Sequence, residues 1–505
     1  MEQTTYLKIN PADSVVVCLT PKKKGDIIEV DGQTVTVSED TPAGHKLLIK
    51  DVREGENIIK YGYPIGHARQ DLKAGDWVNE KNLKTNLIGT LEYTYNPVDE
   101  KLSIAKENRC FKGYRRKNGD VGVRNEIWVV PTVGCVNGIA ERLVKQLSHE
   151  MGLDCHQSSA PQVDAVYAWH HNYGCSQLSE DHENTRKVLR DICLHPNAGG
   201  VLVLSLGCEN NQPEDFMQML GDYDRDRIKL LVTQRVEGDE VEAGMEILRE
   251  LYRKAVQDVR EDIPVSELRV GLKCGGSDGF SGITANPLVG EFSDWLVAQG
   301  GTSVLTEVPE MFGAETILMN RCETRELFDQ TVALINNFKN YFLSHGEPVG
   351  ENPSPGNKAG GISTLEDKAL GCTQKCGRAP VSGVMEYGDR LQHKGLNLLS
   401  APGNDLVAST ALASCGCHIV LFTTGRGTPF GTFVPTMKIS TNPTLAKNKP
   451  GWVDFSAGQL IEGRTMQEVL PEFIDKVIAV ASGEKARNEE NDYREIAIFK
   501  NGVTL

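Results

Sequence analysis

Apolar strands that alternate with amphipathic helices constrain the fold of this chain most, from about residue 111 onward. Residues 127–133 form one continuous apolar segment, and apolar residues recur at helical spacing over 136–147. The pattern repeats at 201–206 and at 229–232, which the helical stretch 241–259 follows. Strands that are apolar on both faces need cover on both faces, so the sequence predicts α/β domains with largely parallel sheets.

The same alternation continues in the last part of the chain. Residues 269–273 read as a strand that a glycine-rich loop follows, and Pro287 opens a helix over 287–298. Further strands are expected at 302–308, 397–400 and 418–422, and further helices at 405–414 and 466–481. The long loop 346–363 is rich in Gly, Pro, Asn and Ser, which is typical of a functional loop.

The first hundred residues have a different pattern of short strands and turns. Strands are expected at 14–19, 27–30 and 34–37, with Asp31-Gly32 as a hairpin turn between the last two. We therefore predict a small β-rich domain over 1–98 and a polar linker over 99–110. Two α/β domains, 111–262 and 263–505, would follow.

Composition narrows the class of protein. The chain has 505 residues, with 69 acidic against 54 basic side chains, a net charge of −15, so we expect no nucleic-acid partner. No segment is long and apolar enough for a membrane span, and residues 1–11 lack a basic-then-apolar leader, so we expect a cytoplasmic protein without a membrane partner. Thirteen cysteines then indicate free thiols or metal ligands rather than a disulfide framework.

Five cysteines lie in loops where ligands bind in α/β proteins. Cys135, Cys208 and Cys274 each follow an apolar strand, and Cys175 and Cys372 lie in loops with glycine or polar neighbours. We expect these thiols to meet in one crevice, although any one of them alone is better interpreted as a small buried side chain. No Cys-x-x-Cys pair exists, so structural zinc is disfavoured and iron is favoured.

A glycine-rich loop at 275–279 matches Gly-x-Ser-x-Gly, but the expected helix begins only at residue 287, which argues against a hydrolase. Its backbone donors suit a carboxylate or phosphate instead. Basic residues in or near glycine-bearing loops are the candidate anchors for such an anion. They are Lys46, Lys60, Arg124, Lys358, Lys375 and Arg426.

Longer motifs resemble one known family over almost the whole chain. Gly44-His45-Lys46 and Lys60-Tyr61-Gly62 resemble a small β domain called SAF. The rest resembles the core of the altronate and galactarate dehydratase family. The motifs are Gly113-Tyr114-Arg115-Arg116, Thr132-Val133-Gly134-Cys135, Tyr173-Gly174-Cys175-Ser176, Gly207-Cys208-Glu209-Asn210, Cys274-Gly275-Gly276-Ser277, Glu307-Val308-Pro309-Glu310, Asn352-Pro353-Ser354-Pro355 and Thr424-Gly425-Arg426-Gly427.

The resemblance implies a hydro-lyase of hexuronate catabolism that removes water from a small-molecule sugar acid. Members that convert D-altronate to 2-dehydro-3-deoxy-D-gluconate are the most similar, although this chain has Asn79 and Asn82 in a segment where they carry a His-x-His-Asn run. Galactarate or a sulfonated hydroxy acid remains an alternative substrate, and a sugar-acid binding protein is the alternative that is not an enzyme. A homo-oligomer is left open.

The resemblance also leads to expected roles for single residues. Iron, as Fe²⁺ or an iron-sulfur cluster with Mn²⁺ as a substitute, would be held by some of Cys135, Cys175, Cys208, Cys274 and Cys372. His45, or else His171, is the expected acid or base, because a histidine titrates near neutral pH, and Lys46 is the third expected catalytic residue. Substrate binding is expected from Lys60, Arg124, Ser277, Lys375 and Arg426.

Overall fold

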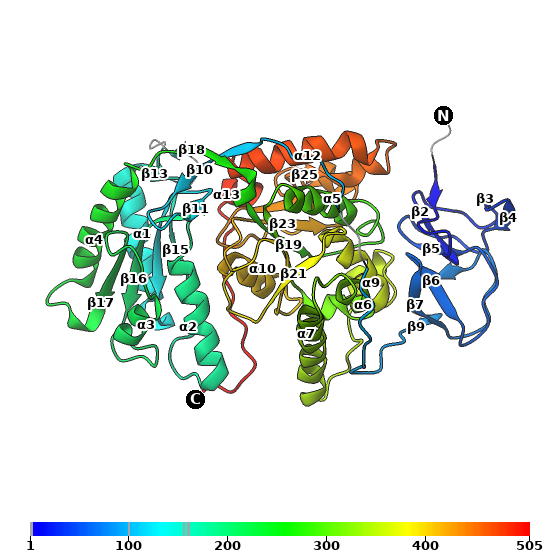
Figure 1. Cartoon of the computed structure of the whole chain (residues 1–505), viewed down its shortest axis with the longest axis horizontal. Coiled ribbons are helices and arrows are strands. Elements are labelled where there is room, and N and C mark those ends of the chain that lie inside the picture. The colour runs from blue at the N-terminus through cyan, green and yellow to red at the C-terminus, as the bar shows by residue number, and fades with distance from the viewer. Residues whose placement is uncertain (1–3, 99–101, 155–156, 159–161) are drawn as a thin grey trace.

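The computed structural model describes residues 4–98, 102–154, 157–158 and 162–505. Residues 99–101 of the predicted linker lie outside the described residues. Figure 1 shows three bodies in a row: an N-terminal domain at one end, a domain from the last part of the chain in the centre, and a domain from residues 111–262 at the other end. We call these the N-terminal, third and second domains.

The N-terminal domain consists of short antiparallel strands, as the turn pattern predicts. One sheet has the order β1-β2-β5-β8, a second has the order β6-β7-β9, and β3 pairs with β4 alone. Asp31 and Gly32 both have positive φ angles at the β3–β4 turn, as such a hairpin requires. The strands are β1 (Tyr6–Leu7), β2 (Val15–Cys18), β3 (Ile27–Val30), β4 (Gln33–Thr36), β5 (Lys46–Leu48), β6 (Asn57–Lys60), β7 (Tyr63–Ala68), β8 (Trp77–Val78) and β9 (Leu83–Lys84).

The second domain is built on a four-stranded parallel sheet of order β15-β12-β16-β17. Helices α1 and α4 pack on one face, and α2 covers the other, where the core continues into the third domain. The strands are β12 (Glu126–Pro131), β15 (Val166–Ala168), β16 (Ala198–Ser205) and β17 (Ile228–Val232); the helices are α1 (Asn137–Met151), α2 (Ser179–Cys193), α3 (Pro213–Met219) and α4 (Glu240–Ala255). Short strands β13 (Leu153–Asp154) and β14 (Gln157–Ser158) pair with each other antiparallel after α1.

A small antiparallel sheet joins the second and third domains. It contains β10 (Cys110–Arg115), β11 (Val121–Gly122) and β18 (Glu261–Pro264), in the order β11-β10-β18. The chain thus enters and leaves the second domain along neighbouring strands, which brings both of its ends to the third domain.

The third domain has a seven-stranded, wholly parallel sheet of order β21-β22-β20-β19-β23-β24-β25. Its strands are β19 (Arg269–Cys274), β20 (Thr302–Leu305), β21 (Val381–Met385), β22 (Gly395–Leu399), β23 (Ile419–Thr424), β24 (Thr436–Ser440) and β25 (Phe455–Ser456). Its helices are α5 (Ala285–Ala298), α6 (Glu315–Met319), α7 (Arg325–Ser344), α8 (Pro355–Ala359), α9 (Leu365–Cys372), α10 (Asp405–Ser414), α11 (Pro443–Asn448), α12 (Met466–Ala481) and α13 (Arg487–Glu490).

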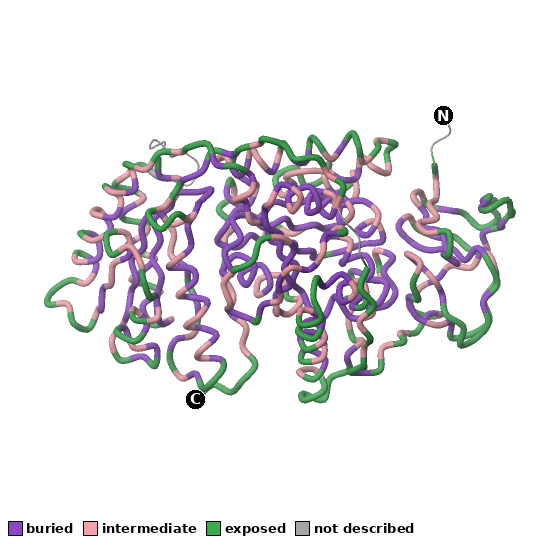
Figure 2. The backbone as a smooth tube through the Cα atoms, viewed as in Figure 1, coloured by how far each residue is buried: buried purple, intermediate pink, exposed green. Residues whose placement is uncertain are grey.

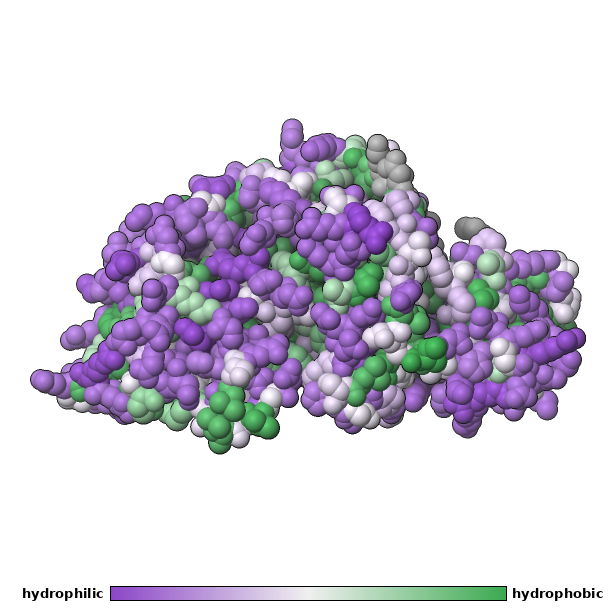
Figure 3. Space-filling model, turned by 60° about the horizontal axis from the view of Figure 1, so that its bottom comes forward, coloured by the Kyte–Doolittle hydropathy of each residue, from purple (hydrophilic) through white to green (hydrophobic). Residues whose placement is uncertain are grey.

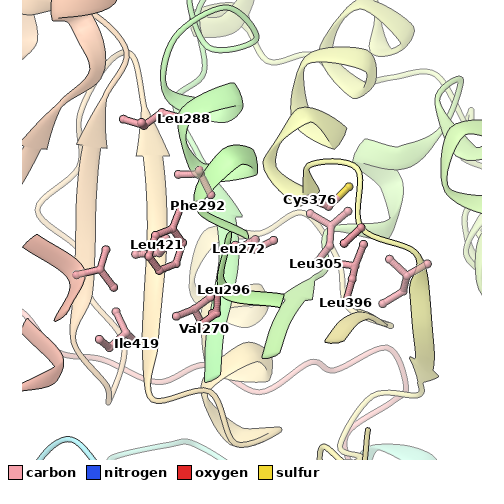
Figure 4. Packing of buried hydrophobic residues seen from close by; sticks show 14 of the residues in the cluster. Val270, Leu272, Leu288, Phe292, Leu296, Leu305, Cys376, Leu396, Ile419 and Leu421 are labelled. Carbon is pink, nitrogen blue, oxygen red and sulfur yellow. The ribbon is translucent and has the colours of Figure 1, made fainter. Parts of the chain in front are cut away.

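Helices on both faces cover this sheet, which confirms the predicted α/β class. Helices α5 and α12 pack together on one face, and α10 packs on β19 from the other. Figure 4 shows the interior beneath α5, where side chains of α5 meet those of four central strands. In Figure 2 most residues of the sheets are coloured as buried, and many residues of the outer loops are coloured as exposed.

The molecular surface is mostly hydrophilic in the view of Figure 3. Among the described residues, no helix combines the length and the apolar character that crossing a bilayer requires.

Two buried ion pairs fasten the second domain to the end of the chain. Arg124, just before β12, binds both carboxylate oxygens of Glu489 in α13 at 2.7 and 2.8 Å and also donates to the carbonyls of Val480 and Glu484. Glu126 pairs with Arg494 at 2.8 Å. Each partner is almost wholly buried, so neither charge is satisfied by water.

We expect Arg124→Met to lower the free energy of unfolding by about 3 to 5 kcal/mol, because it leaves the buried Glu489 carboxylate without a counter-charge. Urea denaturation followed by circular dichroism measures the loss. The control is Arg487→Ala, which removes an exposed ion pair with Glu490 and should cost less than about 1 kcal/mol. Equal losses in the two variants would contradict a special role for Arg124.

Candidate active site

A loop of the N-terminal domain inserts between two glycine-rich loops of the third domain. The Gly44 carbonyl lies so close to Gly279 and Gly361 that a Cβ on either would stand 1.8 or 2.4 Å from its oxygen. A side chain at either position would push the domains apart. The two third-domain loops are the glycine-rich loop after β19 and the end of the long loop 346–363.

A fully buried carboxylate accepts hydrogen bonds from two lysines across this domain boundary. Lys46 and Lys60 each donate to Asp367 of α9 at 2.8 Å, and Lys46 also donates to the Gly361 carbonyl and the Ser363 hydroxyl. Burial would raise the pKa of Asp367, but the two ammonium groups lower it strongly. Burial lowers the pKa of Lys46 to about 8 despite Asp367. Both lysines therefore hold the domains together.

His45 lies at the same boundary with both ring nitrogens engaged. Trp77 Nε1 donates to His45 Nδ1 at 3.1 Å, so the proton is on Nε2, which lies 3.3 Å from the Ala359 carbonyl. Burial and the neighbouring Lys46 lower the pKa of His45 and keep the ring neutral. In this arrangement the ring fixes the long loop, and its predicted catalytic role stays a prediction.

Two thiols and a carboxylate meet at the carboxyl end of β19, beside this boundary. Cys274 Sγ and Cys372 Sγ are 3.2 Å apart, and Glu310 Oε2 lies 3.4 and 3.0 Å from them. All three side chains are buried. Cys274 ends β19, Cys372 ends α9, and Glu310 belongs to the 3₁₀ turn Val308–Met311. The convergence of these elements thus creates a group of three metal-binding atoms.

Three buried lysines surround this group. Lys375 Nζ lies 2.9 Å from Cys274 Sγ and 3.1 Å from Glu307, Lys368 donates to Glu310 at 2.7 Å, and Lys273 bridges Glu307 and Asp405. Burial would raise the pKa of Glu310, but Lys368, Lys273 and Lys375 together lower it. The contact with Cys274, together with burial, raises the pKa of the Cys372 thiol.

Glu307 holds a strained backbone conformation to reach this cluster. Its φ of +67° is left-handed, which is uncommon for a residue other than glycine. Its carboxylate accepts from the amide of Cys274 at 3.0 Å as well as from Lys273 and Lys375. Such strain persists only where the surroundings enforce it, and it is typical of functional sites.

The donor set and the charge of the cluster fit a divalent metal ion. With both thiols protonated, the ammonium groups of Lys273, Lys368 and Lys375 balance the carboxylates of Glu307, Glu310 and Asp405. Thiols must lose their protons to bind metal. Exchange of two thiol protons for a divalent cation leaves the buried charge unchanged, and thiolates beside a carboxylate suit a metal of intermediate softness.

A narrow pocket of about 10 Å³, which has room for about one water molecule, lies between this group and the N-terminal domain. Lys60 and Tyr61 line it from the N-terminal side, and Ser277, Lys368 and Cys372 line it from the third domain. The Ser277 hydroxyl is buried and makes no hydrogen bond to the described residues. The cavity therefore offers an unused hydroxyl beside cationic groups and a metal-binding thiol.

The remaining predicted residues lie in different places. Arg426 is exposed, and its backbone amide donates to the Gly276 carbonyl at the rim of the glycine-rich loop. Lys375 is beside Cys274 rather than in the cavity. Arg124 does not belong to this site, because its guanidinium is fully engaged by Glu489 and backbone carbonyls. The glycine-rich loop is no hydrolase elbow, since Ser277 is buried well before α5 begins.

Of the five thiols predicted to share one crevice, the structure shows a contact only between Cys274 and Cys372. Cys135, Cys175 and Cys208 are exposed at the second sheet, whereas Cys274 and Cys372 are buried in the third domain. Figure 1 shows the second domain and the N-terminal domain at opposite ends of the molecule. His171 is also in the second domain. Its Nε2 lies 2.8 Å from the Pro131 carbonyl and its Nδ1 accepts from the Tyr173 amide, while burial lowers its pKa to about 4.

Sequence reasoning did not assign Glu310, Asp367 or Lys368 to the site. Glu310 lies in a motif that carries the family resemblance, and that motif could have identified it as a candidate site residue. Asp367 and Lys368 belong to α9, whose eight residues are all buried, so no apolar periodicity marks the helix.

We expect Asp367→Asn to release the N-terminal domain, because Lys46 and Lys60 would stay buried without a counter-charge at a cost of about 3 to 5 kcal/mol. Limited proteolysis in segments 87–98 and 102–110 and hydrogen exchange in β5 should both increase. Asp51→Asn, which removes only the exposed pair with Lys73 in the same domain, is the control and should change neither. Unchanged protection in Asp367→Asn would refute this account of docking.

Comparisons with known proteins agree with this arrangement. Three sequence-family models match: the altronate/galactarate dehydratase SAF domain over residues 4–86, the D-galactarate dehydratase/altronate hydrolase second domain over 113–256, and the D-galactarate/altronate dehydratase C-terminal domain over 265–504.

Whole proteins match as well. Altronate dehydratases of Bacillus subtilis (strain 168) and Escherichia coli (strain K12) are 56% and 53% identical to the chain, each over 99% of it and 100% of the relative. The galactarate dehydratase (L-threo-forming) of Escherichia coli is 32% identical over 95% of the chain and 93% of its own length. The N-terminal domain is thus a SAF domain, and the chain belongs to the altronate/galactarate dehydratase family of hydro-lyases.

Proposed function

We propose that this protein converts D-altronate to 2-dehydro-3-deoxy-D-gluconate and water. The full-length identity of 56% and 53% to two altronate dehydratases supports this substrate over galactarate, whose dehydratase is only 32% identical. The observation that carries the chemistry is the buried group of Cys274, Cys372 and Glu310 beside a cavity that the SAF domain closes.

The reaction removes a proton from C2 and the hydroxyl group from C3. The C2 proton is only weakly acidic because it lies next to a carboxylate, so the negative charge that develops there must be stabilised by cations. The departing hydroxyl takes up a proton and leaves as water. The resulting enol rearranges to the 2-keto acid, so the reaction needs no oxidant or reductant.

Cys274, Cys372 and Glu310 would hold a divalent ion, for which we propose Fe²⁺ with Mn²⁺ as a substitute. When bound, such an ion acts as a Lewis acid toward substrate oxygens. The twelve described cysteines are all free thiols, which fits a reducing compartment such as the cytoplasm.

The chain's own residues supply the rest of the site. Lys60 donates hydrogen bonds to Asp367 and Tyr61. Lys368 donates hydrogen bonds to Glu310 and Asn352. Because an ammonium group has three N–H donors, each lysine keeps one of them for a substrate carboxylate. The free Ser277 hydroxyl can bond a substrate hydroxyl. Burial raises the pKa of Tyr61, so its phenol stays protonated and can give a proton to the departing hydroxyl.

We expect anaerobically prepared enzyme with Fe²⁺ to form a 2-keto acid from D-altronate faster than from galactarate or other sugar acids. Semicarbazone absorbance measures the product. In deuterated water, nuclear magnetic resonance should show one deuteron at C3 from the tautomerisation. Faster turnover of galactarate would reassign the substrate, and binding of D-altronate without product would favour a sugar-acid binding protein.

We expect Cys274→Ser and Cys372→Ser to lose the bound divalent ion and to lower turnover at least about 100-fold. Metal content by mass spectrometry and the keto-acid assay measure the two effects. Cys376→Ser is the matched control, because this buried cysteine contacts Arg321 and the core rather than Glu310. Full metal content in Cys274→Ser and Cys372→Ser would place the metal elsewhere.

A further inference from the structure

Three exposed cysteines gather at the carboxyl edge of the second sheet. Cys135 follows β12, Cys208 follows β16, and Cys175 lies in the loop after β15. Among the twelve described cysteines only four are exposed, and the fourth is Cys110 in the sheet between the domains. Exposed thiols are normally avoided on protein surfaces, so three at one sheet edge call for a function.

Hydrogen bonds tie the three loops to one another directly next to these cysteines. The Gly134 amide donates to the Tyr173 carbonyl at 2.9 Å, which joins the loop of Cys135 to that of Cys175. The Asn211 amide donates to the Gly174 carbonyl at 3.0 Å, which joins the loops of Cys175 and Cys208. The backbones that carry the three thiols are therefore held at one place.

A glycine precedes each of the three cysteines and permits this close packing. A Cβ on Gly174 would lie 2.0 Å from the Thr132 carbonyl oxygen, and one on Gly134 would lie 2.8 Å from the His171 carbonyl oxygen. Gly207 has a φ of +122°, and its Cβ would meet Gln234 at 3.0 Å. In each of the three loops, the glycine before the cysteine thus lets the backbone pack closely against a neighbouring segment.

Two buried polar side chains stabilise the loops from beneath. The Glu209 carboxylate accepts from the hydroxyls of Thr132 and Ser205 and from the amides of Leu206 and Gly207. Burial would raise the pKa of Glu209, but these donors lower it. His171 connects the Pro131 carbonyl to the Tyr173 amide, as described above. The edge is rigid although its thiols are exposed.

One side-chain amide bonds a thiol directly, and two others bond the backbone of the same loops. Gln234 Nε2 donates to Cys208 Sγ at 3.3 Å, the Asn210 side chain accepts from the Ser176 amide, and Asn137 donates to the His171 carbonyl. Amide donors suit a cofactor whose sulfur atoms accept hydrogen bonds. This shell differs from the lysine and carboxylate cluster around Cys274.

We propose that Cys135, Cys175 and Cys208 hold an iron-sulfur cluster of the four-iron type, with one iron left without a protein ligand. A single tetrahedral ion with metal-sulfur bonds of about 2.3 Å would need sulfurs about 3.8 Å apart. Within the described part of the chain, the only three metal-binding side chains that approach one another within 4.8 Å are Cys274, Glu310 and Cys372. Cys135, Cys175 and Cys208 do not form such a group, so this arrangement does not fit a single ion, whereas in a cluster each cysteine binds a different iron.

This second site is separate from the proposed reaction site. The second domain lies on the far side of the third domain from the SAF domain in Figure 1. The three thiols of the second site are exposed to solvent, whereas Cys274 and Cys372 are buried. The two centres therefore differ in composition and can be lost independently.

The test is anaerobic reconstitution of the full chain with ferric iron, sulfide and a thiol reductant, followed by removal of unbound iron. We expect about four acid-labile sulfides per chain and the visible absorption of sulfide bound to iron. Cys135→Ser, Cys175→Ser and Cys208→Ser should each lose most of the sulfide. Cys110→Ser, the matched exposed control, should keep it.

Cys274→Ser separates this proposal from the proposed function, because it should lose turnover and keep the sulfide. A second measurement needs no variant: iodoacetamide should alkylate Cys110 in the reconstituted protein while Cys135, Cys175 and Cys208 are protected. Iron without sulfide in the wild-type chain would overturn the proposal. Equal sulfide in the triple variant, or equal alkylation of all four exposed thiols, would overturn it too.

Discussion

The carboxylate of Asp367 pairs with two lysines that burial would otherwise destabilise, and the candidate site depends on this. Lys46 and Lys60 come from the SAF domain, and Asp367 comes from α9 of the third domain. The next residue, Lys368, binds Glu310, and Cys372 ends the same helix. One short helix therefore fixes the docking of the SAF domain, a wall of the cavity and a metal-binding thiol.

The two large domains use the same structural principle with opposite surroundings. In both, cysteines follow parallel strands at the edge of a sheet where ligands bind in α/β proteins. In the third domain the SAF domain and α9 cover this edge, so the thiols are buried among lysines and carboxylates. In the second domain the thiols are exposed, and the Gln234 amide donates to one of them. Burial and charge, rather than fold, distinguish the two places.

Sequence patterns predicted the regular parts of the fold because those parts follow local rules. Helices α10 and α12 have the predicted bounds, and Asp31-Gly32 forms the predicted hairpin turn. The strand expected over 302–308 ends at Leu305, because Glu307 takes a left-handed conformation that no periodicity encodes. Helix α7 and strands β21 and β24 were not predicted either.

The candidate site was predictable only in part, because its members meet through tertiary packing. Cys274, Cys372, Lys46 and Lys60 were identified from their loops and motifs, and the structure brings them to one region. The division of the five cysteines into two groups depends on which sheet carries each strand, which local sequence does not specify. Asp367 and Lys368 lie in a helix without amphipathic character, so their charges gave no sign that they are buried.

Charge balance decides which ligand the buried cluster accepts. A neutral molecule would not change the balance between the three ammonium groups and the three carboxylates. It would therefore gain little electrostatic binding energy from them. A monovalent cation would replace one thiol proton at unchanged net charge, so only one of the two thiols would bind it as a thiolate. A divalent ion uses both thiols and leaves the net charge of the cluster unchanged, which avoids the large cost of an unpaired charge away from water. A carboxylate beside two thiolates suits a metal of intermediate softness rather than ions that prefer oxygen alone.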